Sequence, residues 1–260
     1  MKRTLILLFG IACYVSFLPV FLYLYAFLAN LQMTGLAEQW PILKTLVPYS
    51  IDYGREMGNP VAAVLINLGL IALFGIQHSV MARQGFKRAW TRIVPPAAER
   101  PMYVLVTSLV LVVMYWQWRP IDHLLWNAES SVGIGLGYGI LLLGLALVLL
   151  STFLINHFHL FGLQQVVWNF LGKVVPAAKF RTPFLYRIVR HPLYTGLFLS
   201  FWATPAMSCG HLLFALGMSA YLFIGIRYEE KDLKEFHPEY EKYAEQVPML
   251  APVPGRSYKG

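Results

Sequence analysis

The chain contains little cysteine and few charged residues. Its two cysteines, Cys13 and Cys209, stand alone in or beside apolar segments. They give neither a metal-ligand spacing nor a disulfide framework, so we expect two small buried side chains and no metal site. Charged residues make up 13% of the chain, against about 25% in soluble domains. This composition excludes an ordinary soluble domain.

Nucleotide-binding and hydrolase signatures are also absent. The sequence has no P-loop, no Gly-x-Ser-x-Gly elbow and no His-Glu-x-x-His zinc motif. Alternate glycines occur between 133 and 139, but they open an apolar segment instead of following a strand. We interpret them as small residues that allow close helix packing.

Long apolar runs dominate what is present. Hydrophobic residues form 57% of the 260 residues, and runs of about 20 apolar residues are typical of transmembrane helices. Five apolar segments, the last of them split into a C-terminal hairpin, predict an all-α integral membrane bundle of about six transmembrane segments. They are 5–31, 59–82, 102–118, 133–156 and 192–227.

The last segment is too long to be one transmembrane helix. As a single helix it would extend about 54 Å, against a hydrocarbon core of about 30 Å. Pro205 and the turn-forming residues 208–210 lie at its middle. We therefore expect two short helices, 192–207 and 211–227, in a tight hairpin, with a partly re-entrant hairpin as the alternative.

The loops between the segments differ in charge. Basic residues dominate 83–100 and 157–190, whereas 32–58 and 119–131 are mildly acidic. Basic loops face the cytoplasm, so we expect both termini and a helical C-terminal tail on that side. The net charge of +8 lies in these short loops, which indicates the lipid bilayer and not nucleic acid as the partner.

Arg190-His191-Pro192 stands before the final hairpin. Proline suits the first turn of a helix, where no N–H is needed, so Arg190 and His191 fall just outside a helix N-terminus, which favours anions. Tyr194 and Gly196 follow on the first turns, and a glycine permits close approach of a ligand or a neighbouring backbone. The alternative is a basic turn that anchors the protein at the membrane surface.

Two adjacent carboxylates, Glu229 and Glu230, follow the hairpin at the same membrane face. We expect one of them to receive a cationic or amine-bearing ligand; in the alternative, both pair with nearby lysines or arginines. The helix should continue to about Phe236, before a proline. Farther on, Tyr240 and Tyr243 are candidates for stacking on a base or contacting a cation, or for a surface aromatic belt.

Polar side chains also interrupt the ends of two other segments. His78 lies near the end of the second segment, and Asn156 and His157 follow the fourth. Ionisable groups at membrane depth are functional candidates by default. For any one histidine, a structural hydrogen bond is the competing interpretation.

The order and spacing of these motifs resemble the isoprenylcysteine carboxyl methyltransferase superfamily of membrane methyltransferases. RHPLYTG, an apolar hairpin, EEKDLKEF and a tyrosine-containing tail ending in Val-Pro carry the resemblance over about 183–254. QHSVMAR from Gln77, Glu99-Arg100, and Asn156-His157-Phe158 with LFGL from Leu160 resemble the bacterial methanethiol S-methyltransferase branch, a neighbour of NnrU-like proteins. With these motifs, the resemblance covers nearly the whole chain.

The resemblance implies one membrane methyltransferase domain, 1–260, with transmembrane helices in 1–156 and the cofactor-binding loop, hairpin and tail in 157–260. It implies S-adenosylmethionine as methyl donor, a small volatile thiol such as methanethiol as acceptor, and a bacterial inner membrane as location. The implied cofactor site consists of Arg190, His191, Tyr194, Gly196, Glu229, Glu230, Tyr240 and Tyr243.

Methylation of a thiol requires a protein group that takes up the thiol proton, because the thiolate and not the thiol is the nucleophile. We expect His157 to be the general base, with His78 as the second choice and Asn156 orienting the base or the substrate. One position departs from the superfamily: Gln246 precedes the tail Val-Pro, where carboxyl methyltransferases carry a basic residue. A carboxylate as methyl acceptor would need a cationic side chain beside it, so this departure favours a thiol as methyl acceptor.

Other functions stay open on the sequence. The acceptor could be a carboxylate or a lipid, as in the isoprenylcysteine enzymes. An NADPH-dependent membrane reductase with a similar C-terminal architecture is a further alternative, and so is a non-catalytic membrane protein or transporter. A transporter would place polar groups along a path through both leaflets, whereas the polar motifs gather on the predicted cytoplasmic side.

Overall fold

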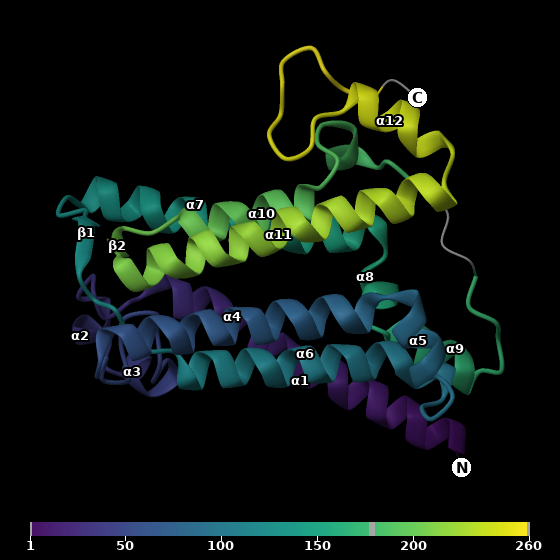
Figure 1. The fold of residues 1–260 in the computed structure, drawn as a ribbon, viewed down its shortest axis with the longest axis horizontal. Helices are drawn as coiled ribbons and strands as arrows, with labels where there is room; N and C mark the ends of the chain where they lie inside the picture. The colour runs from purple at the N-terminus through teal and green to yellow at the C-terminus, as the bar shows by residue number, and fades with distance from the viewer. Residues whose placement is uncertain (1, 177–179, 259–260) are drawn as a thin grey trace. The chain divides into compact units, whose positions relative to one another are not determined.

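The computed structural model describes residues 2–176 and 180–258. Helices make up most of this chain (Figure 1), and two short strands interrupt them. The elements are, in order, α1 (Lys2–Ala29), α2 (Leu36–Gln39), α3 (Ile42–Leu46), α4 (Pro60–Ala82), α5 (Gln84–Trp90), α6 (Pro96–Gln117), β1 (Leu124–Asn127), α7 (Ser131–Ile155), α8 (His157–Leu160), α9 (Leu163–Phe170), η1 (Phe184–Arg187), α10 (Pro192–Trp202), β2 (Ala206–Ser208), α11 (Cys209–Phe236) and α12 (Glu239–Gln246).

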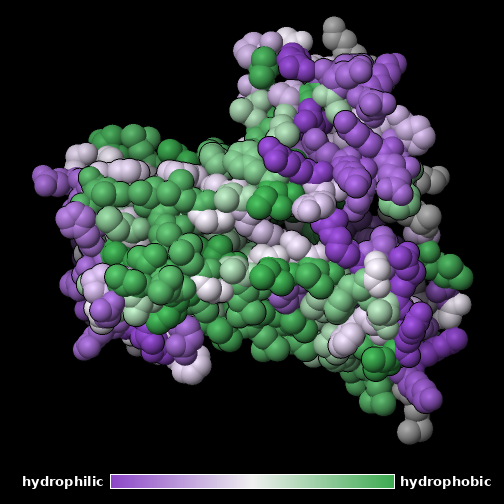
Figure 2. Space-filling model, viewed as in Figure 1, coloured by the Kyte–Doolittle hydropathy of each residue, from purple (hydrophilic) through white to green (hydrophobic). Residues whose placement is uncertain are grey.

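Five helices of the described chain are long and apolar enough to cross a membrane, namely α1, α4, α6, α7 and α11. They contain between 22 and 28 residues, so at about 1.5 Å per residue each can cover a hydrocarbon core of about 30 Å. Their exposed side chains are largely hydrophobic (Figure 2), as expected where lipid is the solvent. The prediction of an all-α integral membrane protein is confirmed.

Local sequence explains where two of these helices begin. The side chain of Asn59 accepts a hydrogen bond from the backbone N–H of Ala62 at 3.1 Å, and Pro60 occupies the first turn of α4. At the start of α7, Ser130 accepts from the N–H of Gly133 at 3.1 Å. Each cap satisfies an N–H group that the helix itself leaves unpaired.

The described chain forms two compact units. The first contains the described residues of 1–128, 157–177 and 206–214, and the second those of 129–156, 178–205 and 215–260. Helix α11 therefore begins in the first unit and continues in the second. A single domain over 1–260 stays a prediction, and each unit is described below by itself.

The first unit is a helical bundle in which α6 packs against both α1 and α4, and α9 packs against α1. The contact of α1 with α9 is close: a Cβ added to Gly10 would lie 2.6 Å from the side chain of Val166. Aromatic rings form part of the core, with the Phe27 and Tyr115 centroids 5.3 Å apart and those of Trp118 and Phe214 5.6 Å apart.

A buried polar cluster lies at one end of this bundle. Asp52 accepts hydrogen bonds from Asn30 Nδ2 at 2.7 Å and from Ser208 Oγ at 2.6 Å, while Ser50 Oγ donates to Asn30 Oδ1 at 2.8 Å. The cluster joins the residue after α1, the loop before α4 and the strand β2. Strand β2 pairs with β1 in an antiparallel two-stranded sheet.

Asp52 is expected to make stability depend on pH. Burial raises its pKa to about 6, although its hydrogen bonds from Ser208 and Asn30 lower it, and Asp122 raises it further. The folded state thus binds the proton more tightly than the unfolded chain, whose aspartate pKa is about 3.9. The resulting stabilisation is complete below about pH 4 and is lost as the pH rises through 6.

We therefore expect the Tm of the detergent-solubilised protein to fall between about pH 4.5 and 6.5. The full titration of Asp52 corresponds to a change of about 3 kcal/mol in the free energy of unfolding. Thermal unfolding of the Asp52→Asn variant, whose side chain does not titrate, should show a flatter dependence over this range. An unchanged slope in that variant would assign the pH dependence to other groups.

The second unit is built around α7 and α10, which run alongside each other (Figure 1). Glycines allow this approach, because a Cβ added to Gly196 would lie 2.6 Å from the backbone oxygen of Gly144. A Cβ on Gly137 would lie 2.8 Å from the backbone nitrogen of Pro205, so the packing interpretation holds for Gly137. At Gly139, by contrast, a Cβ would meet no atom of the described chain within 4 Å.

The hairpin differs in detail from the prediction. A break between two helices is confirmed, but α10 ends at Trp202 and α11 continues to Phe236, so the second helix is not short. The eleven residues of α10 rise about 16 Å, roughly half of a hydrocarbon core. The six residues 203–208 are mostly extended and add about 20 Å. Helix α10 alone is therefore too short to cross the membrane, and sequence hydropathy does not reveal this division.

Candidate functional site

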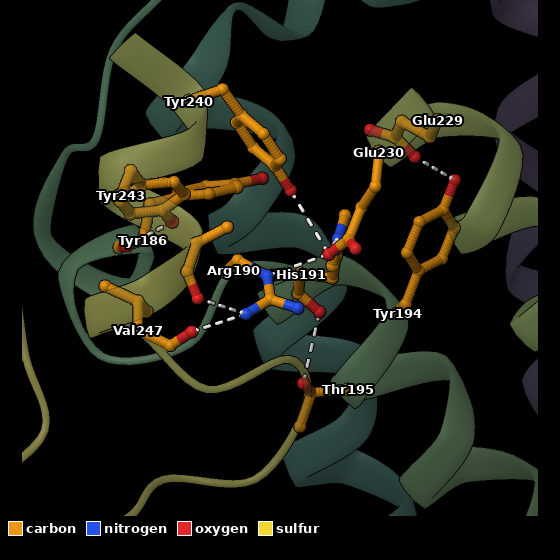
Figure 3. Close-up of polar contacts among 11 residues, drawn as sticks. Tyr186, Arg190, His191, Tyr194, Thr195, Glu229, Glu230, Tyr240, Tyr243 and Val247 are labelled. Atoms are coloured by element: carbon orange, nitrogen blue, oxygen red, sulfur yellow. Dashed lines mark hydrogen bonds and ion pairs between the residues drawn. The ribbon is translucent and has the colours of Figure 1, made fainter. Parts of the chain in front are cut away.

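The two charged motifs of the C-terminal half meet at one carboxylate. Arg190 and His191 precede α10, and Glu230 lies in the last turns of α11 (Figure 3). Arg190 Nε donates to Glu230 Oε1 at 2.8 Å, and His191 Nε2 lies 2.9 Å from the same oxygen. Glu230 thus pairs with a loop arginine, which is the structural alternative that the sequence left open for this residue.

These three side chains are largely withdrawn from solvent. The exposed fraction is 12% for the Arg190 side chain, 4% for His191 and 17% for Glu230. A guanidinium in such a place depends on its partner, because removing one member of a buried pair leaves an uncompensated charge. The ion pair therefore fixes the entry of α10 against the end of α11.

The C-terminal tail folds back onto the same arginine. Arg190 Nη1 donates to the backbone oxygens of Ala244 at 2.9 Å and Val247 at 2.6 Å (Figure 3). The next two carbonyls, of Pro248 and Met249, accept from the backbone N–H groups of Arg190 and its neighbour at 2.8 and 3.1 Å. The tail after α12 is thus held along the start of α10 by main-chain atoms.

Tyr240 and Tyr243 of α12 line the side of the ion-pair cluster that faces the tail. Both are buried, with exposed fractions of 1% and 2%, and their rings pack together with that of Phe180. Tyr240 donates to Glu230 Oε1 at 3.2 Å, and burial together with the charge of Glu230 raises the pKa of Tyr240, so its hydroxyl stays protonated. Neither ring is an exposed surface belt.

Glu229 and the half-buried Tyr194 form the more open part of the site. The Tyr194 hydroxyl donates to Glu229 Oε2 at 2.7 Å (Figure 3). Glu229 is exposed, whereas the adjacent Glu230 is half-buried. The Tyr194 ring also lies against that of His191, with the centroids 5.5 Å apart. An exposed carboxylate, held by a phenol, therefore lies beside the buried ion pair.

Gly196 has a clear packing role. Its missing side chain leaves room for the backbone of α7, because a Cβ would lie 2.6 Å from the oxygen of Gly144 and 2.9 Å from the nitrogen of Val148. The sequence left two reasons for this glycine, the approach of a ligand or that of a neighbouring backbone. The second is present in the structure, and a place in the cofactor site stays a prediction.

His157, the expected base, belongs to the first unit. Its exposed fraction is 4%, and the Tyr14 hydroxyl lies 2.7 Å from its Nε2. Phe158 and Phe161 flank the ring, with centroid distances of 5.4 and 4.8 Å. Burial lowers the pKa of His157, so the imidazole is neutral at pH 7 and can accept a proton.

His78, the second choice for the base, lies in α4 of the same unit. Its Nδ1 is 3.3 Å from Thr107 Oγ1, and its ring stacks on Phe74 at a centroid distance of 5.2 Å. Tyr103 donates to the backbone oxygen of His78 at 3.3 Å. These contacts agree with a structural hydrogen bond, the competing interpretation for a single histidine.

Asn156 is exposed and forms the C-terminal cap of α7, in the second unit. Its role in orienting base or substrate stays a prediction. Two other motifs, Glu99-Arg100 and LFGL from Leu160, do lie in contact. Arg100 Nε donates to the backbone oxygen of Leu160 at 2.8 Å, and Gly162 lies against Pro101.

Sequence reasoning missed Tyr14 and Thr107, the hydrogen-bond partners of the two histidines. It also missed the tail carbonyls of Ala244 and Val247 that hold Arg190. Tyr14 is one of three tyrosines in the first apolar segment, so residue type alone did not single it out. Backbone carbonyls leave no signal in sequence, because every residue carries one.

Comparison with known proteins relates the whole chain to a set of curated relatives. The chain is 45% identical to the methanethiol S-methyltransferase of Crocosphaera subtropica, over 98% of this chain and 95% of the relative. It is 42% identical to the methanethiol S-methyltransferase of Mycobacterium tuberculosis, over 98% and 99%. Nurim of Xenopus laevis is 31% identical over 68% of this chain and 65% of its own length. No protein-family model and no solved structure matches the chain.

Proposed function

Because the chain belongs to the methanethiol S-methyltransferase family, we propose that it transfers a methyl group from S-adenosylmethionine to methanethiol and releases dimethyl sulfide. The observation that carries the cofactor assignment is the meeting of Arg190, His191 and Glu230, with the exposed Glu229 and the half-buried Tyr194 beside them. This cluster combines fixed buried charges with an accessible carboxylate, as a charged cofactor requires.

The exposed groups suit the charges of S-adenosylmethionine, which supplies an electrophilic sulfonium methyl group. Glu229 would receive its ammonium group, since an exposed carboxylate can pair with a cation at little desolvation cost. The first turn of α10, which begins with Pro192, would favour its carboxylate, because N–H groups at a helix start attract anions. Arg190 and Glu230 position these groups through their own contacts, and Tyr240 and Tyr243 close the site.

His157 would accept the proton of the thiol. The thiol is a weaker acid than free cysteine, whose pKa is about 8.5, so little thiolate exists at pH 7. A neutral imidazole near an apolar surface can take up this proton as the sulfur attacks. His78 is the second candidate for the same role.

We further propose that the protein lies in a bacterial inner membrane, with both termini and the cofactor cluster in the cytoplasm. The basic loops 83–100 and 157–190 support this orientation. An even number of crossings agrees with it if α10 and its extended continuation form the sixth. A volatile apolar thiol and its product can then pass through lipid, while the charged cofactor arrives from the cytosol.

The direct test uses the purified full-length protein in detergent or lipid nanodiscs. S-adenosylmethionine and methanethiol are added, and dimethyl sulfide is followed by gas chromatography. We expect formation of dimethyl sulfide that depends on both compounds, and binding of S-adenosylmethionine by calorimetry. No product and no binding would overturn the proposal, whereas binding without product would point to another methyl acceptor.

Glu229 should matter for cofactor affinity more than for folding. Glu229→Gln removes the charge that pairs with the ammonium, and a charge-assisted hydrogen bond contributes about 1.5–3 kcal/mol, so we expect Kd for S-adenosylmethionine to rise about 10- to 100-fold. Its Tm should stay within about 2 °C, since an exposed substitution changes stability little. The matched control is Glu241→Gln, another exposed glutamate; equal Kd values for the two variants would remove Glu229 from the site.

A further inference from the structure

Tyr14 lies in the first transmembrane helix, α1, on a surface that is otherwise apolar. Its neighbours Ile11 and Val15 have exposed fractions of 39% and 58%, as expected for side chains that face lipid. Tyr14 itself is half-buried. A phenol is thus placed where a small apolar compound dissolved in the bilayer can reach the protein.

The Tyr14 hydroxyl covers one nitrogen of a buried histidine. It lies 2.7 Å from His157 Nε2, and the two rings meet edge to face, with centroids 5.7 Å apart and planes at 89°. His157 is only 4% exposed, so the phenol is the more accessible member of the pair. The Phe161 ring lies 6.3 Å from that of Tyr14 and 4.8 Å from that of His157, which encloses the contact in apolar surface.

We propose that Tyr14 is the group that meets the thiol, and that it relays the thiol proton to His157. This inference rests on the proposed function and adds a catalytic residue to it. A tyrosine can donate and accept hydrogen bonds through one oxygen, so it can take a proton from the substrate while it gives its own to Nε2. The histidine then acts through the phenol and needs no direct contact with the substrate.

The step is balanced. A lone pair of the thiol sulfur forms the new S–C bond to the methyl group, and the S–C bond of the sulfonium donor breaks, with its electron pair left on the departing thioether. The S–H proton moves to the Tyr14 oxygen, and the Tyr14 proton moves to His157 Nε2. The positive charge of the sulfonium ends as an imidazolium, which returns its proton to water before the next turnover.

Other titratable groups near α8 are common to the wild type and the Tyr14→Phe variant, so the comparison of the two controls for them. One of them, Arg100, binds the backbone oxygen of Leu160. The pKa of His159 is lowered by burial and by the charges of Arg100 and Lys87, so His159 stays neutral above pH 7. Burial lowers the pKa of Lys87, so only a change of rate that is present in the wild type and lost in Tyr14→Phe reports on the pair of Tyr14 with His157.

The test compares kcat/KM for methanethiol in the wild type and in Tyr14→Phe from about pH 7 to 10.5. General-base assistance contributes about 10²- to 10⁴-fold, so we expect the variant to be at least about 100-fold slower at pH 7. The ratio of wild type to variant should shrink at least about tenfold toward pH 10.5, because a thiolate formed in solution needs no proton acceptor. Binding of S-adenosylmethionine should stay unchanged.

The matched control is Tyr23→Phe. Tyr23 lies on the same helix. Its hydroxyl donates to the backbone oxygen of Tyr49 at 2.8 Å and accepts from the backbone N–H of Tyr49 at 3.1 Å, so this variant also loses phenolic hydrogen bonding. We expect it to keep the wild-type rate and pH profile. A pH-independent defect in Tyr14→Phe, or an equal loss in both variants, would overturn the proton relay and leave only a structural role for Tyr14.

A second measurement tests the contact without relying on turnover. Diethyl pyrocarbonate modifies exposed imidazole nitrogens, and mass spectrometry reports the extent of modification at His157. We expect Tyr14→Phe to raise the modification rate several-fold relative to wild type and Tyr23→Phe, and equal rates in all three would overturn the contact. A wild-type protein that makes no dimethyl sulfide would count against the proposed function. The modification rate of His157 would still show whether Tyr14 covers it, because that measurement does not need turnover.

Discussion

Glu230→Ala is expected to abolish methyl transfer and to release the C-terminal tail. Arg190, His191 and Tyr240 all use the same oxygen of Glu230, and the substitution leaves the largely buried guanidinium of Arg190 without its counter-ion. Breaking a buried ion pair costs about 3–5 kcal/mol, and the 17% exposure of the Glu230 side chain places the expected loss near the lower figure. This is the largest effect that we expect from a single substitution in the cluster.

Three measurements separate the parts of this expectation. Dimethyl sulfide formation should fall below detection, calorimetry should show no binding of S-adenosylmethionine, and limited proteolysis should cut the tail after α11 much faster. Glu235→Ala is the matched control, since Glu235 is an exposed acid on the same helix, and it should behave as wild type. A Glu230→Ala protein with normal turnover would mean that the cluster is not the cofactor site.

Gly196→Ala is expected to have the second largest effect, and it acts through packing. The new Cβ would lie 2.6 Å from the backbone oxygen of Gly144 and 2.9 Å from the backbone nitrogen of Val148. Backbone atoms in a packed helix cannot move aside, so α10 must shift away from α7. Overpacking of this kind costs about 1–3 kcal/mol or more, which corresponds to a fall in Tm of roughly 6–12 °C at the upper figure.

Gly139→Ala provides the matched control on α7. A Cβ at Gly139 meets no atom of the described chain within 4 Å, and alanine is the better helix former, so Tm should be unchanged or slightly higher. The Gly196 variant also decides between the two explanations of that glycine. Normal Tm with lost binding of S-adenosylmethionine would support the cofactor-site prediction and contradict the packing role.

The sequence predicted the membrane fold well because lipid imposes strict rules on composition and length. The long helices that begin at Pro60 and Ser131 follow from apolar runs with polar caps before them. The meeting of Arg190 and His191 with Glu230 was also predictable, since a hairpin returns the chain to the face from which it started. These inferences depend on hydropathy, segment length and charge, which are read directly from residue types.

Other parts of the site depend on geometry that residue types do not encode. Hydropathy treats 192–207 as one apolar run, and it gave no sign that α10 stops at Trp202 and continues as extended chain. The burial of Tyr240 and Tyr243 depends on how α12 packs, and their rings were equally compatible with a surface belt. The contact of Tyr14 with His157 joins residues 143 apart in the sequence, and only the packing of α1 and α8 brings them together.

The way in which Arg190 holds the tail has a consequence for sequence variation. Its Nη1 binds the carbonyls of Ala244 and Val247, and every residue type offers a carbonyl at the same place. Single substitutions there can therefore accumulate without disturbing the contact, provided that they keep the helix and its end. A deletion or insertion of one residue in α12 would instead rotate these oxygens by about 100° around the helix axis. At these positions, selection should therefore act on the length of the segment more strongly than on the identity of its residues.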